Sequence, residues 1–116
     1  MEFVESWIGF DLDGTLAIST GVSASDVIGP PVERMVIRLQ EHVKRGDKVK
    51  IFTARVGCPD EESNKIARAA IEKWCVMYLG FLPEITNIKD IGMRLLYDDR
   101  ARQVIENTGI VVGEDE

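Results

Sequence analysis

The chain has 116 residues, which is the size of one compact domain built around a single hydrophobic core. Its 14 Lys and Arg against 20 Asp and Glu give a net charge of −6, which excludes broad, non-specific binding along a nucleic-acid backbone. Hydrophobic residues make up 45% of the chain, so the composition is that of a folded domain and not of a disordered segment. We therefore expect one domain over residues 1–116, without a separate substrate domain.

Targeting signals are not evident in the sequence. No stretch approaches the roughly 18 consecutive apolar residues of a membrane-spanning helix. The first six residues contain Glu2 and Glu5 and no basic residue, which is unlike a secretory signal. The two cysteines, Cys58 and Cys75, form no metal-binding or redox motif and are expected as reduced thiols. These features predict a cytoplasmic protein with no membrane partner.

Short apolar runs that end in polar residues predict buried strands. Three runs of this kind occur, at residues 7–10, 49–53 and 95–97. Residues 84–88 are ambiguous between a strand and an extended loop, and residues 110–112 predict a final edge strand.

Helical patterns lie between these runs. After Pro31, apolar residues recur at helical spacing, and Gly46 suits the end of the helix. Asp60 is the expected N-cap of a second helix, which ends at Gly80. The apolar positions expected on the buried side of this second helix are Ile66, Ala69, Ala70, Trp74 and Met77. Residues 101–107 predict a third, short helix.

The alternation of strands and helices predicts an α/β fold, namely a three-layer, Rossmann-like domain with a central, mainly parallel sheet. Residues 15–31 are rich in Ser, Gly and Pro and have no clear period, so we expect a loop there, which we call the flap. Such sheets bind ligands beyond the carboxyl ends of their strands, so we expect the site there.

Polar residues follow all three expected strands and converge on one edge of the sheet. The residues concerned are Asp11 and Asp13, then Thr53 and Arg55, and last the acidic pair Asp98 and Asp99. Four carboxylates so close together would destabilise the fold unless a cation neutralised them. Oxygen ligands without His or Cys favour a hard ion, of which Mg²⁺ beside a phosphate is the usual case. The sequence therefore predicts a magnesium site that involves Asp11, Asp13, Asp98 and Asp99.

These residue types suit phosphoryl transfer. Asp11 can attack phosphorus and form an aspartyl-phosphate, while Asp13 can protonate the leaving oxygen and then activate water. Thr53 offers a hydroxyl to the phosphoryl group. Thr15, which can orient Asp13, and Arg55 are the candidate substrate-binding residues. Two interpretations of Arg55 stay open, because it can clamp a substrate phosphate or carboxylate or can pair with the acidic cluster.

Four short motifs occur along the chain in a fixed order. The apolar strand Ile8–Phe10 leads into the sequence DLDGT over Asp11–Thr15, and the strand that follows the next helix ends in Thr53. Lys89 and the acidic pair come third and fourth. In this order the motifs resemble those of the haloacid dehalogenase-like hydrolase superfamily. Neither the flap nor the stretch after Thr53 is long enough for the folded cap domain of larger members, so the chain resembles the small members without a cap, which implies an open site.

The resemblance implies a Mg²⁺-dependent phosphatase in which Asp11 is the nucleophile and Asp13 the general acid and base. It also implies that Asp11, the backbone carbonyl of Asp13 and one member of the acidic pair bind Mg²⁺, with Asp99 favoured. Lys89 is implied as the active-site lysine. Lys89 lies closer in sequence to the acidic pair than the corresponding lysine does in many members, so Lys65 is the second candidate for this role.

Two other functions stay open. A receiver-like signalling domain also uses a phospho-accepting Asp, a Thr or Ser, a Lys and an acidic pair, but its acidic pair comes first in the sequence. A catalytically idle member would serve as a binding module. The expected substrate is a small phosphorylated molecule such as a nucleotide. A phosphorylated nucleic-acid end and a homo-oligomer stay open as partners, whereas binding along a nucleic-acid backbone is not expected.

Overall fold

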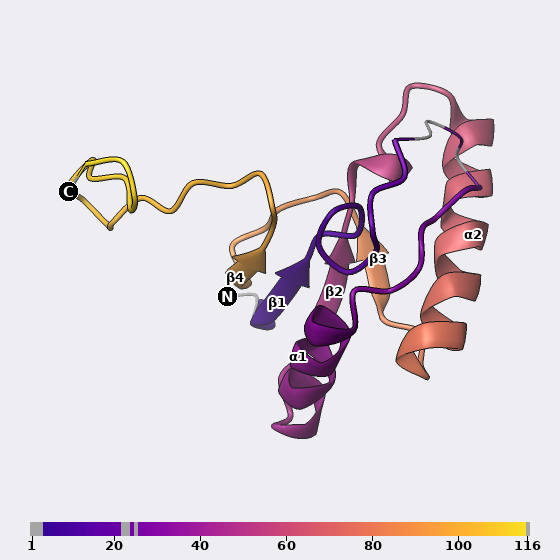
Figure 1. Cartoon of the computed structure of the whole chain (residues 1–116), viewed down its shortest axis with the longest axis horizontal. Helices are drawn as coiled ribbons and strands as arrows, with labels where there is room; N and C mark the ends of the chain where they lie inside the picture. The colour runs from indigo at the N-terminus through magenta and orange to yellow at the C-terminus, as the bar shows by residue number, and fades with distance from the viewer. Residues whose placement is uncertain (1–3, 22–23, 25, 116) are drawn as a thin grey trace.

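The structure is a computed structural model of the chain, and it describes residues 4–21, 24 and 26–115. Glu2, on which part of the targeting prediction depends, lies outside the described residues. At the centre is a four-stranded sheet in the order β3-β2-β1-β4, in which all neighbouring strands are parallel (Figure 1). The strands are β1 (Trp7–Phe10), β2 (Val49–Phe52), β3 (Glu84–Thr86) and β4 (Met93–Tyr97). The predicted α/β fold is confirmed, and the ambiguous segment 84–88 contains the strand β3.

Two helices pack against one face of this sheet. α1 (Glu33–Lys44) connects β1 to β2, and α2 (Glu61–Leu79) connects β2 to β3 after the short 3₁₀-helix η1 (Ala54–Val56). Both connections cross the sheet in the same direction, so right-handed crossovers place both helices on the same face. They share one buried core with the strands, which includes Ile8, Phe10, Leu39, Ile51 and Ile71. Neither of these described helices has both the length and the hydropathy that a membrane span requires.

No helix of the described residues lies on the opposite face of the sheet. Side chains, among them Trp7, cover that face instead. The Trp7 ring is almost fully buried and lies so close to Gly9 that an added Cβ at Gly9 would be 3.1 Å from it. The indole N–H of Trp7 donates to Asp90 at 2.8 Å, and the ammonium group of Lys50 lies 4.5 Å from the ring centre. The predicted three-layer arrangement is therefore not confirmed.

The ends of α2 follow the prediction, but among the predicted buried positions only Trp74 is buried. The Asp60 side chain accepts the backbone N–H of Glu62, and Gly80 ends the helix at a φ of 85°. The buried residues are Ala67, Ile71, Trp74, Cys75 and Leu79, whereas Ile66 and Met77 are exposed. The helix carries apolar residues on more than one side, so its contacts decide which side is buried. One of these contacts is the indole N–H of Trp74, which donates to the carbonyl of Gly29 in the flap.

The chain after β4 leaves the domain (Figure 1). The helix predicted over residues 101–107 is wrong, and the strand predicted over 110–112 is reduced to one antiparallel bridge between Val104 and Val111. Asn107 and Gly109 adopt positive φ angles of 64° and 73°, which interrupt a helix. Because this segment extends outward, the radius of gyration is 15.1 Å, above the roughly 13 Å of a compact chain of this length.

Candidate active site

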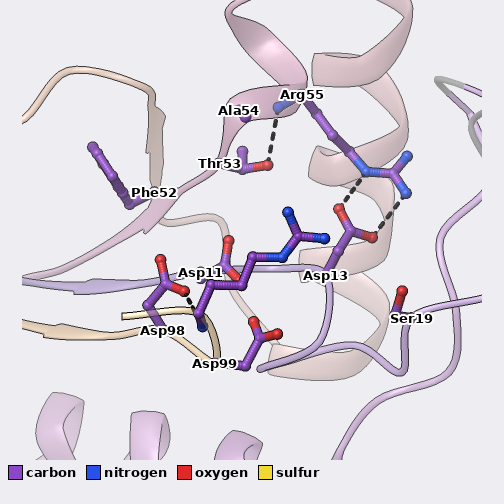
Figure 2. Close-up of a pocket in the computed structure, with 10 residues that line it drawn as sticks. Asp11, Asp13, Ser19, Phe52, Thr53, Ala54, Arg55, Asp98 and Asp99 are labelled. Atoms are coloured by element: carbon purple, nitrogen blue, oxygen red, sulfur yellow. Dashed lines mark hydrogen bonds and ion pairs between the residues drawn. The ribbon is translucent and has the colours of Figure 1, made fainter. Parts of the chain in front are cut away.

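The carboxyl ends of β1, β2 and β4 meet at one edge of the sheet around a pocket of about 360 Å³ (Figure 2). Phe10 of β1 pairs with Ile51 of β2 and with Tyr97 of β4, so the residues after these positions emerge side by side. The pocket is lined by Asp11, Asp13, Ser19, Phe52, Thr53, Ala54, Arg55, Asp98, Asp99 and Arg100. The structure thus brings together the polar residues that follow three separate strands, as their positions in a parallel sheet predict.

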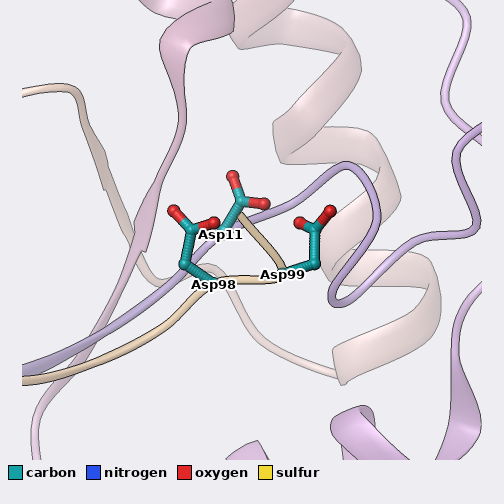
Figure 3. Close-up of side chains that lie close together, drawn as sticks. All are labelled: Asp11, Asp98 and Asp99. Carbon is teal, nitrogen blue, oxygen red and sulfur yellow. The ribbon is translucent and has the colours of Figure 1, made fainter. Parts of the chain in front are cut away.

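Three carboxylates lie close enough to share one cation (Figure 3). Asp11, Asp98 and Asp99 each offer an oxygen, and these oxygens all lie within 4.8 Å of one another. Burial, together with a hydrogen bond to Asp99 and the charges of the acidic pair, raises the pKa of Asp11 to about 7. A divalent cation would relieve this repulsion, and a donor set of carboxylate oxygens fits Mg²⁺.

The carboxylate of Asp13 is engaged by Arg55 and is not part of this group of three. It accepts hydrogen bonds from Nε of Arg55 at 2.7 Å and from Nη2 at 2.8 Å (Figure 2). The same guanidinium donates to the backbone carbonyls of Ala24 and Val27 in the flap. Of the two interpretations of Arg55, the structure therefore shows the pairing with an acidic residue. For Asp13, the backbone carbonyl remains as the metal ligand that the resemblance implies.

Thr15 contacts Asp11 and Asp99, and the expectation that it orients Asp13 is wrong. Its buried hydroxyl lies 3.1 Å from Oδ1 of Asp99 and 3.4 Å from Oδ2 of Asp11. The hydroxyl also accepts the backbone N–H of Asp99 at 3.1 Å. Thr15 does not line the pocket described above. It instead joins the loop after β1 to the end of β4, and so holds two of the three carboxylates in place.

Gly14 allows this close approach of the two chain segments. Its φ of 89° lies in the left-handed region, which favours glycine. A Cβ added at this position would lie 2.6 Å from Oδ2 of Asp99. The DxDGT motif therefore contains a glycine where both the backbone conformation and the neighbouring carboxylate require one.

Thr53 is buried at the end of β2, where its hydroxyl accepts the backbone N–H of Arg55 at 3.2 Å. This hydrogen bond begins η1 and fixes the position of the hydroxyl at the wall of the pocket. The oxygen keeps its own proton to donate to a ligand. This position agrees with the predicted contact between Thr53 and a phosphoryl group.

Neither candidate lysine is among the described residues that line the pocket. Lys89 is exposed in the segment between β3 and β4, and Lys65 is exposed on α2. The basic side chains that line the pocket are Arg55 and Arg100. Sequence reasoning missed Arg100, although its place directly after the acidic pair was a signal. Its backbone N–H donates to Oδ1 of Asp98 at 2.8 Å.

His42 supports the strand ends behind the site. Its ring is buried, with Nδ1 at 2.9 Å from Oδ2 of Asp47 and Nε2 at 3.0 Å from the hydroxyl of Tyr97. The ring of Tyr97 stacks on Phe10 at a centroid distance of 4.7 Å. Phe10 and Tyr97 directly precede carboxylates of the site, so this packing fixes where those carboxylates emerge.

Comparisons of the chain with models of known protein families, with curated proteins and with solved structures found no match. The motifs and the geometry of this site are therefore the features that indicate a function.

Proposed function

We propose that the chain is a Mg²⁺-dependent phosphatase that hydrolyses phosphomonoesters through an aspartyl-phosphate on Asp11. The observation that carries the proposal is the approach of oxygens from Asp11 and the acidic pair within 4.8 Å, beside a pocket that Asp13 and Thr53 also line. The order of the motifs supports a capless, Rossmann-like member of the haloacid dehalogenase-like superfamily.

The first chemical step transfers the phosphoryl group to the protein. When bound, Mg²⁺ supplies charge neutralisation for the carboxylates and the phosphoryl oxygens. A carboxylate oxygen of Asp11 attacks phosphorus, and the bond between phosphorus and the ester oxygen breaks. Asp13 gives its proton to that oxygen, so that an alcohol leaves. The hydroxyl of Thr53 donates to a phosphoryl oxygen and keeps phosphorus in line with Asp11.

The second step regenerates Asp11. Asp13, now ionised, takes a proton from a water molecule while the water oxygen attacks phosphorus. The bond between phosphorus and the Asp11 oxygen breaks, and inorganic phosphate leaves. Because Arg55 engages both oxygens of Asp13, proton transfer in either step requires at least one of these two hydrogen bonds to open. Since the same guanidinium also donates to the carbonyls of Ala24 and Val27, the position of the flap affects proton transfer by Asp13.

The substrate class follows from the size and charge of the site. A pocket of about 360 Å³ accepts a small phosphorylated molecule such as a nucleotide, with the rest of a larger substrate left outside. The net charge of −6 disfavours contacts along a nucleic-acid backbone, so a polynucleotide would enter only by a phosphorylated end. A cytoplasmic location and the absence of a membrane partner belong to the same proposal.

Replacement of the nucleophile by an isosteric amide tests the proposal. Asp11→Asn should abolish Mg²⁺-dependent hydrolysis of an aryl phosphate, and chelation of the metal should do so reversibly in the wild type. Asp115→Asn, the same change at an exposed carboxylate outside the site, should have no effect. Hydrolysis that survives Asp11→Asn would contradict the mechanism. A phosphorylated protein that persists for minutes without turnover would favour the receiver-like alternative.

A further inference from the structure

We propose that Arg100, and not a lysine, is the cationic side chain that binds the phosphoryl group in this pocket. The inference rests on the proposed function and assigns a further residue to the same site. Arg100 lines the pocket together with Asp11, Asp13 and Thr53.

The other basic side chain of the pocket is already occupied. Two nitrogens of Arg55 donate to Asp13, and its guanidinium also donates to the carbonyls of Ala24 and Val27. Only 16% of the Arg55 side chain is exposed. A phosphoryl group could recruit Arg55 only by displacing these partners, which would release both Asp13 and the flap.

The guanidinium of Arg100 is engaged with no carboxylate of the described residues. Among the described residues it forms no ion pair within 4.0 Å, although it directly follows the acidic pair. Its backbone is held in place, because its N–H donates to Oδ1 of Asp98 at 2.8 Å. The side chain therefore starts from a fixed point at the wall of the pocket, and among the described residues its guanidinium donors have no partner, so they can bind a ligand.

The charge of the site favours such a cation. Four carboxylates line the pocket, so when all four are ionised, one guanidinium and one divalent ion leave a net negative charge there. A phosphate dianion that enters this site needs a further positive charge to balance its own. A planar guanidinium can donate two parallel hydrogen bonds to two phosphoryl oxygens, which is the arrangement that binds phosphate most strongly.

The test measures the binding of inorganic phosphate by calorimetry in the presence of saturating Mg²⁺. Arg100→Gln should raise the Kd of phosphate by about tenfold to a hundredfold, which is the range expected for a charge-assisted hydrogen bond. Arg100→Lys should restore part of the affinity. The affinity for Mg²⁺ without phosphate should be unchanged or higher in Arg100→Gln, because a positive charge beside the acidic pair is lost. A merely structural role of Arg100 would weaken the binding of both ligands.

Arg102→Gln is the matched control. It removes the same charge two positions further along, where the side chain lies 3.7 Å from Glu114 and outside the pocket. Phosphate binding of Arg100→Gln at the wild-type Kd would overturn the proposal, and so would a loss of phosphate binding in Lys89→Gln with Arg100→Gln unaffected. Hydrolysis of an aryl phosphate, and its loss in Asp11→Asn, separately decides the proposed function. Normal hydrolysis with unchanged phosphate binding in Arg100→Gln would reject only the assignment of Arg100.

Discussion

Two parallel hydrogen bonds of 2.7 and 2.8 Å join the guanidinium of Arg55 to the carboxylate of Asp13. The two residues are 42 positions apart and follow different strands of the sheet. Since the same guanidinium also reaches the carbonyls of Ala24 and Val27, one side chain connects the proposed general acid, the end of β2 and the flap.

Replacement of this guanidinium should loosen the flap. In Arg55→Lys the positive charge stays, but a compact ammonium group cannot reproduce the planar fork of donors. We expect a drop of about tenfold to a hundredfold in kcat/KM, together with faster amide hydrogen exchange in residues 26–29, and no change in Mg²⁺ affinity. Arg94→Lys, which alters an exposed arginine paired with Asp47, is the control. Exchange rates equal to those of the wild type would show that Arg55 does not hold the flap.

Metal-free protein should lose stability as the pH rises. Asp11 has a pKa of about 7 in the folded chain and an ordinary value of 3.8, so the folded state binds more protons between these two values. The free energy of unfolding should therefore fall between about pH 4 and about pH 7, and Asp11→Asn should remove this fall. Urea unfolding at about pH 5 and about pH 7.5, with a chelator present, measures the difference. Identical pH dependence in the two proteins would contradict the raised pKa.

Other carboxylates in the chain should not obscure this comparison. The hydrogen bond from His42 and the nearby arginines lower the pKa of Asp47, and Lys50 lowers that of Glu84. The stability that such groups contribute is present above their unfolded pKa values and is lost only as the pH falls through their lowered folded values. Above about pH 5 their contribution is nearly constant, so the difference between wild type and Asp11→Asn isolates Asp11.

Mg²⁺ should stabilise the folded protein at neutral pH. Binding to the folded state alone adds about 2.7 kcal/mol to the free energy of unfolding at a free concentration about 100 times the Kd. The increase in Tm should be larger at about pH 7.5 than at about pH 5, because protons compete with the metal for Asp11. Asp99→Asn should remove most of this increase, whereas Asp115→Asn should keep it. A shift in Tm that persists in Asp99→Asn would place the ion elsewhere.

Gly14→Ala should disrupt the metal site as well as the backbone. Gly14 and Gly46 both have a φ of 89°, but a Cβ at Gly46 meets no described atom within 4 Å, whereas one at Gly14 meets the Asp99 carboxylate at 2.6 Å. Gly46→Ala should therefore cost only the backbone strain of about 1–2 kcal/mol. Gly14→Ala should cost more and should also weaken Mg²⁺ binding, measured by calorimetry. Equal destabilisation by both variants, with unchanged Mg²⁺ affinity, would contradict the close contact with Asp99.

The parts of the fold that depend on local sequence could be predicted, whereas those that depend on distant contacts could not. The strand at residues 7–10 is a short apolar run, and Asp60 and Gly80 mark the ends of α2 by their own chemistry. The buried side of α2 depends on what packs against it, including the flap carbonyl that accepts the Trp74 N–H. The apolar residues after 101 looked helical, but the described residues there have no surface of the domain to pack against.

The same division holds within the site. Residues that follow parallel strands must emerge at one edge, so the meeting of Asp11 with the acidic pair follows from the sequence. Side-chain partners depend on loop paths and rotamers, which is why the partner of Arg55 stayed open and that of Thr15 was wrong. Which basic side chain lines the pocket also depends on loop paths and rotamers, which is why Arg100 was not predicted there and the two lysines were.

Trp7 covers part of the sheet face opposite the two helices, and this has a consequence for solubility. In the described residues no second helical layer covers this surface, and the Trp7 ring packs over Gly9 together with the side chains of Met93 and Leu96. A large apolar surface left bare promotes self-association of proteins. Loss of the Trp7 ring would therefore uncover apolar surface on this face and favour self-association.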